Sequence, residues 1–165
     1  MKDILLQYTK YNLWANLKIG KLLEGLTTDQ VHQSLGGSFD TIRKTTELIL
    51  MAEDIWWQRL CMKEHVAPIN LSEDTEWKVV LQNWEQSSSH LINFTEKIMD
   101  DRGCLHQFHY TNLAGEPFKS TVWECIQHVC NHSTFHRGQL VNYGRSIGLT
   151  KIPSTDFITF SRERN

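Results

Sequence analysis

Apolar residues recur at steps of three and four along four long stretches of the chain, and this period constrains the fold more than any other feature. The stretches cover about residues 3–25, 41–62, 75–99 and 121–148. Because an α-helix brings a side chain back to the same face after about 3.6 residues, each stretch predicts an amphipathic helix. Four such helices with short connections predict an all-α fold, an up-and-down four-helix bundle.

Local signals mark the ends and connections of these helices. Thr121 and Glu124 have the spacing of a capping box, in which two side chains satisfy free amides at the start of a helix. Residues 27–29 predict the cap of a short helical turn, residues 63–74 a loop, and residues 105–120 a small β-hairpin before the last helix. Phe157 and Phe160 predict a tail that packs back onto the bundle. No linker or repeat interrupts the chain, so residues 1–165 are expected to form a single domain.

Composition and charge exclude several classes of protein. A formal net charge of −2 over 165 residues argues against a nucleic-acid partner, because phosphate binding needs a concentrated basic surface. No apolar run approaches the roughly 20 residues that span a bilayer, and the start of the chain has no apolar stretch of signal-peptide length. The four cysteines show no Cys-x-x-Cys spacing, which predicts free thiols in a reducing compartment. A cytoplasmic protein without a membrane partner is therefore expected.

Three histidines lie four residues apart in the last predicted helix, at His128, His132 and His136. A step of four keeps side chains on nearly the same helix face, so His132 and His136 can offer two imidazole nitrogens to one metal ion. Both stand where the apolar pattern calls for Val, Leu or Ile, and an unpaired polar group in a core costs about 1–3 kcal/mol. They are therefore candidate metal ligands. The alternative is that they reach a solvent-accessible cleft or hydrogen-bond to residues on other helices.

The remaining histidines are not expected to bind the same ion. His128 lies about 12 Å along the helix axis from His136, which is too far for one ion to bind all three rings without bending the helix. A supporting or surface role is predicted for it. Arg137 follows His136 and points about 100° away from it, towards a helix flank. The other five histidines are assigned to the surface: His32, His65, His90, His106 and His109.

Several familiar catalytic motifs are absent from the sequence. It contains no Gly-x-Ser-x-Gly nucleophile elbow, no phosphate-binding Gly-x-x-x-x-Gly-Lys loop and no Gly-x-Gly-x-x-Gly dinucleotide motif. The metalloprotease motif His-Glu-x-x-His is also absent, because Ser133 follows His132. Neither a catalytic residue nor a cofactor-binding residue can be assigned from these patterns.

Five segments taken together resemble the DinB-like family, the DNA-damage-inducible helical proteins and not the polymerase that shares the name. The segments are residues 11–16 (YNLWAN), 38–43 (SFDTIR), 52–60 (AEDIWWQRL), 128–139 (HVCNHSTFHRGQ) and 153–157 (PSTDF). The resemblance runs nearly end to end. It implies a four-helix bundle, often a homodimer, with a divalent metal bound by three histidines in a central cleft. It also implies a small-molecule ligand and a low-molecular-weight thiol, because characterised relatives include thiol-dependent transferases and isomerases.

One of the three ligands that the resemblance implies is missing. Two carry over to His132 and His136, and the third belongs to the second helix, where the register places Leu48. Leucine cannot coordinate a metal, and Glu47 is rotated about 100° from that position. Tyr8 on the first helix is a further candidate donor. The expected site is therefore a weakened two-histidine site for zinc or nickel.

Two functions remain open at this point. The first is a metal-assisted transferase or hydrolase of the thiol-transferase type. The second is a non-catalytic bundle that has lost the metal site and binds a small ligand or a partner in a stress-response role. A nucleic-acid-binding stress protein ranks lowest, because nothing in the charge pattern favours it. The metal content of the purified protein distinguishes the first two.

Overall fold

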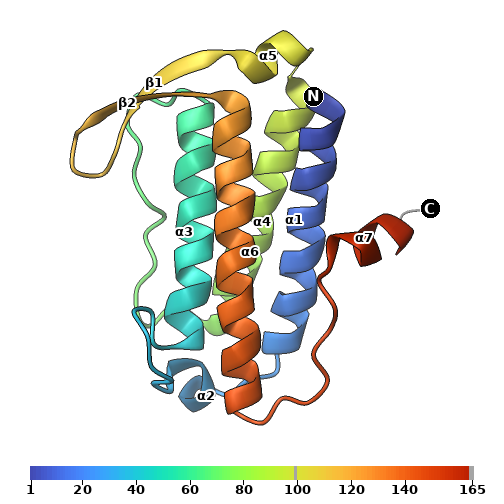
Figure 1. The fold of residues 1–165 in the computed structure, drawn as a ribbon. Coiled ribbons are helices and arrows are strands. Elements are labelled where there is room, and N and C mark those ends of the chain that lie inside the picture. Colours follow the sequence, from blue (N-terminus) through green and yellow to red (C-terminus); the bar gives the residue numbers. More distant parts are fainter. Residues whose placement is uncertain (99, 164–165) are drawn as a thin grey trace.

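Four long helices make up the body of the molecule in the computed structural model, which describes residues 1–98 and 100–163 (Figure 1). They are α1 (Lys2–Leu23), α3 (Ile42–Leu60), α4 (Trp77–Lys97) and α6 (Val122–Ser146). The shorter elements are α2 (Thr28–His32), α5 (Asp101–Leu105), β1 (Gln107–Thr111), β2 (Pro117–Thr121) and α7 (Phe157–Glu163). The predicted all-α four-helix bundle with a hairpin before the last long helix is confirmed. The predicted third helix reached Met99, which lies outside the described residues, as do the last two residues of the predicted domain.

The long helices pack in the order α1, α4, α3, α6, and α6 contacts α1 to close the bundle. Arg43, in the first turn of α3, hydrogen-bonds to Ser72 and Thr75 just before α4. The two helices therefore begin side by side and run in the same direction, opposite to α1 and α6 (Figure 1). Residues 61–76 make this arrangement possible, because they run back along α3 before α4 begins (Figure 1). Only the steps from α1 to α3 and from α4 to α6 reverse the direction of the chain, so the parallel pair α3 and α4 departs from the up-and-down order that short connections predicted.

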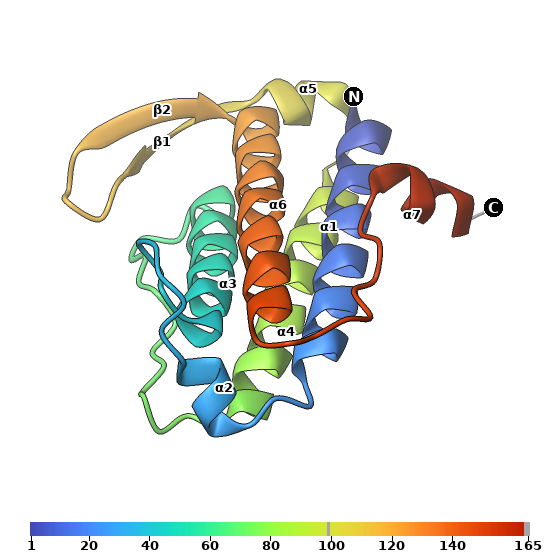
Figure 2. The ribbon, with the colours of Figure 1, turned by 60° about the horizontal axis from the view of Figure 1, so that its bottom comes forward.

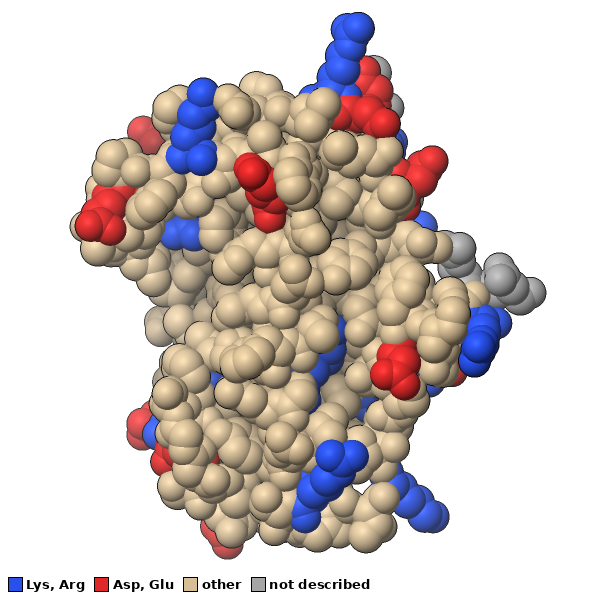
Figure 3. Space-filling model, in the orientation of Figure 1, with Lys and Arg blue, Asp and Glu red and all other residues tan. Residues whose placement is uncertain are grey.

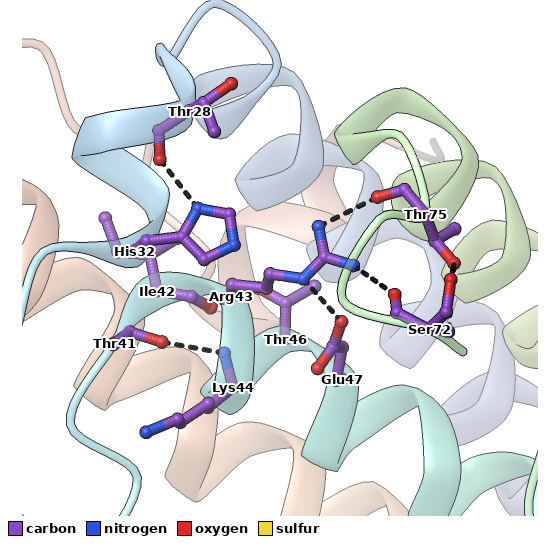
Figure 4. A network of polar contacts seen from close by, with 10 residues as sticks. All are labelled: Thr28, His32, Thr41, Ile42, Arg43, Lys44, Thr46, Glu47, Ser72 and Thr75. Carbon is purple, nitrogen blue, oxygen red and sulfur yellow. Dashed lines mark hydrogen bonds and ion pairs between the residues drawn. The ribbon is translucent and has the colours of Figure 1, made fainter. Parts of the chain in front are cut away.

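Buried Arg43 fastens this long connection to the start of α3 (Figure 4). Its Nη1 donates to the carbonyl of Thr75 at 2.9 Å, and its Nη2 donates to the carbonyl of Ser72 at 3.1 Å. Its Nε forms an ion pair with Glu47 Oε1 at 2.8 Å. The connection contains no helix or strand and therefore lacks the regular backbone hydrogen bonds of such elements. The side-chain bonds of Arg43 hold this end of the connection to α3 instead.

Capping residues begin α2 and α6 where the sequence predicts. Thr121 and Glu124 form the reciprocal capping box at the start of α6, and Thr27 forms another with Gln30 at the start of α2. Both predictions are confirmed. The antiparallel hairpin β1–β2 is also confirmed, and Gly115 turns its chain with a φ of 83°, which favours glycine. The hairpin extends from the end of the bundle past α3 (Figures 1 and 2).

Apolar side chains fill the bundle in two clusters at opposite ends. The cluster at the hairpin end takes in Leu5, Leu60, Leu91 and Val129, together with the buried free thiols of Cys104, Cys125 and Cys130. The cluster at the α2 end takes in Ile19, Ile42, Trp84 and Leu140. Each long helix contributes to both clusters. Between them, every one of these helices places polar side chains in the interior.

The segment after α6 returns to the outside of α1, as predicted. Buried Phe160 packs with Tyr11 and Ala15, and Phe157 lies edge-on to Tyr11 with ring centroids 5.2 Å apart. Figure 2 shows the resulting helix α7 beside α1. Within the described residues, no helix is both long enough and apolar enough to cross a membrane.

Candidate metal centre

The three evenly spaced histidines of α6 separate into a pair and a neighbour. The ring centroids of His132 and His136 are 4.4 Å apart, whereas those of His128 and His132 are 6.1 Å apart. His136 is only 8% exposed, His132 is half-buried, and His128 is exposed. The ring of His128 packs edge-on against Trp56 of α3 at 5.1 Å. The structure therefore brings two of the three imidazoles together.

The tautomer of His136 follows from its hydrogen bond. Its Nδ1 lies 2.6 Å from Oε1 of Gln139, one turn further along α6. An amide oxygen only accepts hydrogen bonds, so Nδ1 carries a proton, and in the neutral ring the lone pair is on Nε2. The rings of Phe39 and Phe135 lie edge-on to the imidazole, with centroids 6.1 and 5.0 Å away. His136 is thus a fixed nitrogen donor with apolar neighbours.

His132 is held in the neutral form by its surroundings. Burial, and then the neighbouring rings of His136 and His128, lower the pKa of His132 to about 4 from the ordinary 6.5. Its Nδ1 is buried and has no hydrogen-bond partner. Near neutral pH the ring therefore has an unprotonated nitrogen and an unsatisfied polar atom. Both properties favour a ligand that accepts a lone pair.

None of the described His, Cys, Asp or Glu side chains supplies a third donor in place of Leu48, which is half-buried on α3. Glu47 turns towards Arg43 and forms the ion pair already described (Figure 4). The hydroxyl of Tyr8 donates to Asn131 Oδ1 at 2.8 Å. Across residues 1–98 and 100–163, no group of three or more His, Cys, Asp or Glu side chains is placed to hold a metal ion.

The donors that are present fit two positions of a metal site. Two imidazoles one helical turn apart are a donor set that suits zinc and nickel. The bond from His136 to Gln139 is of the kind that metal-binding histidines make through their second ring nitrogen. Few charged side chains cover the middle of the face over α3 and α6 (Figure 3). The remaining coordination positions would be filled by water or by ligand atoms.

A fully buried carboxylate, that of Glu53 on α3, lies in the polar layer between the two apolar clusters. It accepts hydrogen bonds from the amides of Asn12 and Asn16 at 2.7 and 2.8 Å, both on α1. It also accepts from the hydroxyls of Ser88 at 2.5 Å and Ser133 at 2.7 Å, on α4 and α6. All four partners donate, so the group acts only as an acceptor, and it links all four long helices.

Arg137 provides the opposite charge in this layer. Its Nη1 donates to the side-chain oxygens of both Asn12 and Asn16 at 2.7 Å, and its Nη2 donates to Thr134 Oγ1 at 2.7 Å. The two asparagines therefore bridge the guanidinium to Glu53. Arg137 is only 2% exposed, because the flank of α6 towards which it was predicted to point faces α1. The rotation of 100° from His136 points the side chain towards α1 and not towards solvent.

This polar layer was not predicted from the sequence, although the sequence contains a pattern that indicates it. Asn12 and Asn16 lie four residues apart on the buried side of α1, and Ser133 and Arg137 repeat that spacing on α6. Polar residues that recur at helical spacing on a buried side need partners on a facing helix. Those partners are not visible until the helices are placed beside one another.

Four of the five histidines assigned to the surface are exposed: His32, His65, His106 and His109. His90 is not, so its assignment is wrong. Its ring stacks on Trp57 with centroids 4.3 Å apart, and its Nδ1 is buried without a partner. The apolar face of the imidazole makes this packing possible, which the polar sequence around His90 did not suggest.

Comparison with known proteins agrees with the geometry of the bundle. The model of the DinB family matches residues 1–164. Protein DinB of Bacillus subtilis is 24% identical over 161 residues, which cover 95% of this chain and 93% of that protein. The crystal structure of a DinB-like protein from Bacillus cereus has a TM-score of 0.68 at 19% identity, over 91% of this chain and 94% of the other. A second DinB-like crystal structure, from B. subtilis, has a TM-score of 0.67 at 14% identity, over 91% and 98% of the two chains. The chain belongs to the DinB family.

Proposed function

We propose that the protein binds one divalent cation, zinc or nickel, through His132 and His136, and that it is a metal-assisted transferase or hydrolase. The observation that carries the proposal is the state of the two rings. One has its tautomer set by Gln139, and the other is a neutral imidazole with a buried nitrogen that lacks a partner. Unpaired buried polar groups are disfavoured unless they serve a ligand.

The chain's own residues have distinct parts in this site. His136 presents Nε2 because Gln139 holds its other nitrogen, and the rings of Phe39 and Phe135 lie edge-on beside it. His132 offers its lone pair without first losing a proton. A bound cation would supply Lewis acidity, which polarises a substrate and lowers the pKa of a coordinated thiol. Leu48 leaves a coordination position free for a low-molecular-weight thiol or for the substrate.

The metal proposal is tested by titrating chelator-treated protein with zinc and with nickel. The native chain is expected to bind one equivalent of metal, and the His136→Ala variant is expected to lose that binding. Leu48→His should bind more tightly than the native chain, because it adds a third imidazole. His109→Ala removes an exposed histidine of β1 and serves as the control. Native protein that takes up neither metal would contradict the proposal.

A further measurement addresses the reaction class. Addition of a low-molecular-weight thiol to nickel-loaded protein should produce a new absorption band from sulfur coordination, and His136→Ala should not show it. A native spectrum that is unchanged by the thiol would contradict the thiol-transferase part of the proposal. Metal binding is tested separately, by the titration with zinc and nickel.

The second candidate is a non-catalytic bundle. It is favoured by the half-buried leucine at position 48 and by the lack of a third donor among the described residues. It predicts that the native chain binds no metal and that Leu48→His gains binding. Equal affinities of the two proteins would contradict it.

A further inference from the structure

Arg59, in the last turn of α3, is a buried cation that the fold leaves unpaired. It is 8% exposed, and its Nε is enclosed without a hydrogen-bond partner. None of the described residues forms an ion pair or a side-chain hydrogen bond with its guanidinium. Two other buried arginines, Arg43 and Arg137, each have at least three such contacts. Arg59 therefore differs from arginines that serve the fold.

Two aromatic rings hold the guanidinium in place without neutralising it. Its central carbon lies 4.8 Å from the ring centroid of Trp56 and 5.2 Å from that of Tyr110. The two rings come from different elements, α3 and β1, and they also contact one another. Cation–π contacts orient an arginine but leave its hydrogen-bond donors free. Burial lowers the pKa of Arg59, as expected for a charge without a partner.

The guanidinium lies at the wall of a cavity between the end of α3, the residues that follow it and the hairpin. The cavity has a volume of about 670 Å³, within the range of roughly 300–1,000 Å³ found for small-molecule sites. Phe108, Val66 and Leu113 supply apolar surface around it. A cation at the wall of an apolar cavity is suited to a ligand with an anionic end and an apolar body.

We propose that this cavity binds an organic carboxylate, with the carboxylate paired to Arg59 and the apolar body packed against Phe108 and Tyr110. One guanidinium matches one negative charge, and its planar fork matches the two oxygens of a carboxylate. A phosphate dianion would need a second cation. Lys63 also lines the cavity, but the negative charge of Glu64 beside it offsets its positive charge, so Arg59 and these two side chains together carry one net positive charge.

The carboxylate site does not require the metal proposed above. Its walls include neither His132 nor His136. It adjoins the histidine row, because Trp56 contacts Arg59 on one side and His128 on another. Chelator-treated protein therefore tests this site alone, and the zinc and nickel titration tests the other.

Binding is measured by calorimetry on chelator-treated protein, with phenylacetate, its neutral isostere phenylacetamide, and phenyl phosphate as probes. Phenylacetate is expected to bind about tenfold to a hundredfold more tightly than phenylacetamide, the ratio expected for a charge-assisted contact. Arg59→Met should abolish that preference, and Arg145→Met, at an exposed position near the opposite end of α6, should leave it unchanged. Equal binding of acid and amide, tighter binding of the phosphate, or no binding of phenylacetate at millimolar concentration would overturn the proposal.

Thermal unfolding of the same variants separates a ligand site from a structural role. Because Arg59 has no polar partner among the described residues, Arg59→Met without ligand should melt close to the native temperature or above it. Arg137→Met removes an arginine with three partners and should lower the melting temperature substantially. A comparable loss in Arg59→Met would show that Arg59 serves the fold, which would overturn the assignment.

Discussion

Replacing Glu53 by glutamine tests whether the buried polar layer carries charge. Glutamine has nearly the same shape, but one oxygen becomes an NH2 group and the side chain becomes neutral. Each of the four hydrogen bonds to the carboxylate would lose the additional strength that charge provides, about 1 kcal/mol per bond. Arg137 would also lose the buried opposite charge, and breaking a buried pair costs about 3–5 kcal/mol. These two estimates describe overlapping effects, so the expected loss is about 3–5 kcal/mol in the free energy of unfolding.

Urea unfolding followed by circular dichroism and by tryptophan fluorescence measures this loss. The midpoint should fall while the slope with urea stays the same, because the surface exposed on unfolding does not change. In a thermal scan the same loss corresponds to a fall of about 6–20 °C, since 1 kcal/mol shifts the melting temperature of a domain of this size by about 2–4 °C. Ser133→Ala is the matched comparison. It removes one of the four donors and should cost about 1.5–3 kcal/mol.

The pairing of Glu53 with Arg137 is tested by combining Glu53→Gln with Arg137→Met. If the two groups stabilise one another, the double variant should lose about 1–3 kcal/mol less than the sum of the single variants. The reasoning would be refuted by a Glu53→Gln variant within 1 kcal/mol of the native chain, or by losses that simply add.

Three further predictions concern other parts of the molecule. Gln139→Ala should weaken zinc binding by about tenfold to a hundredfold, as loss of a supporting contact does; a competing chromophoric chelator measures it, and unchanged affinity would argue against the tautomer inferred for His136. Metal-free protein should lose stability as the pH falls from 6.5 towards 4, because the unfolded chain takes up a proton on His132 before the folded chain does. In His132→Leu the midpoint of urea unfolding should depend less on pH over that range. An equally steep fall of the midpoint in the variant would contradict the lowered pKa of His132. Arg43→Met should release residues 61–76, so that limited proteolysis cuts there faster than in the native chain; an unchanged rate would mean that other contacts hold the connection.

The elements were predictable because their signals are local. The capping box of Thr121 and Glu124 and the turn at Gly115 each depend on residues that are close together in the sequence. The directions of the helices were not predictable in this way. Sixteen residues separate α3 from α4, from 61 to 76, and an extended segment of that length spans about 50 Å. The 19 residues of α3 rise only about 28 Å. The connection is therefore long enough either to turn back at once or to return along the whole helix.

The candidate metal site was predictable only in part. Helical spacing was sufficient to expect that His132 and His136 lie together, but the contact of His136 with Gln139 depends on rotamers. No pattern in the sequence indicated that Arg59 is buried and unpaired. Its lack of a partner depends on what the hairpin and the end of α3 bring near it, and an arginine at the end of a helix is normally in contact with solvent.

The polar layer also determines which packing of the four helices the chain adopts. Apolar stripes alone would allow a helix to slide by one turn, about 5.4 Å, or to exchange neighbours, with little change in buried apolar area. Glu53 on α3 needs donors from α1, α4 and α6 at a single level of the bundle. A one-turn slide of α4 would bring Trp84 or Ile92 to the carboxylate in place of Ser88. A one-turn slide of α1 or α6 would move the asparagines or Ser133 away from the level at which they donate together. The layer thus fixes the axial register and the order of the helices, which leaves the two apolar clusters free to accept many combinations of similar residues.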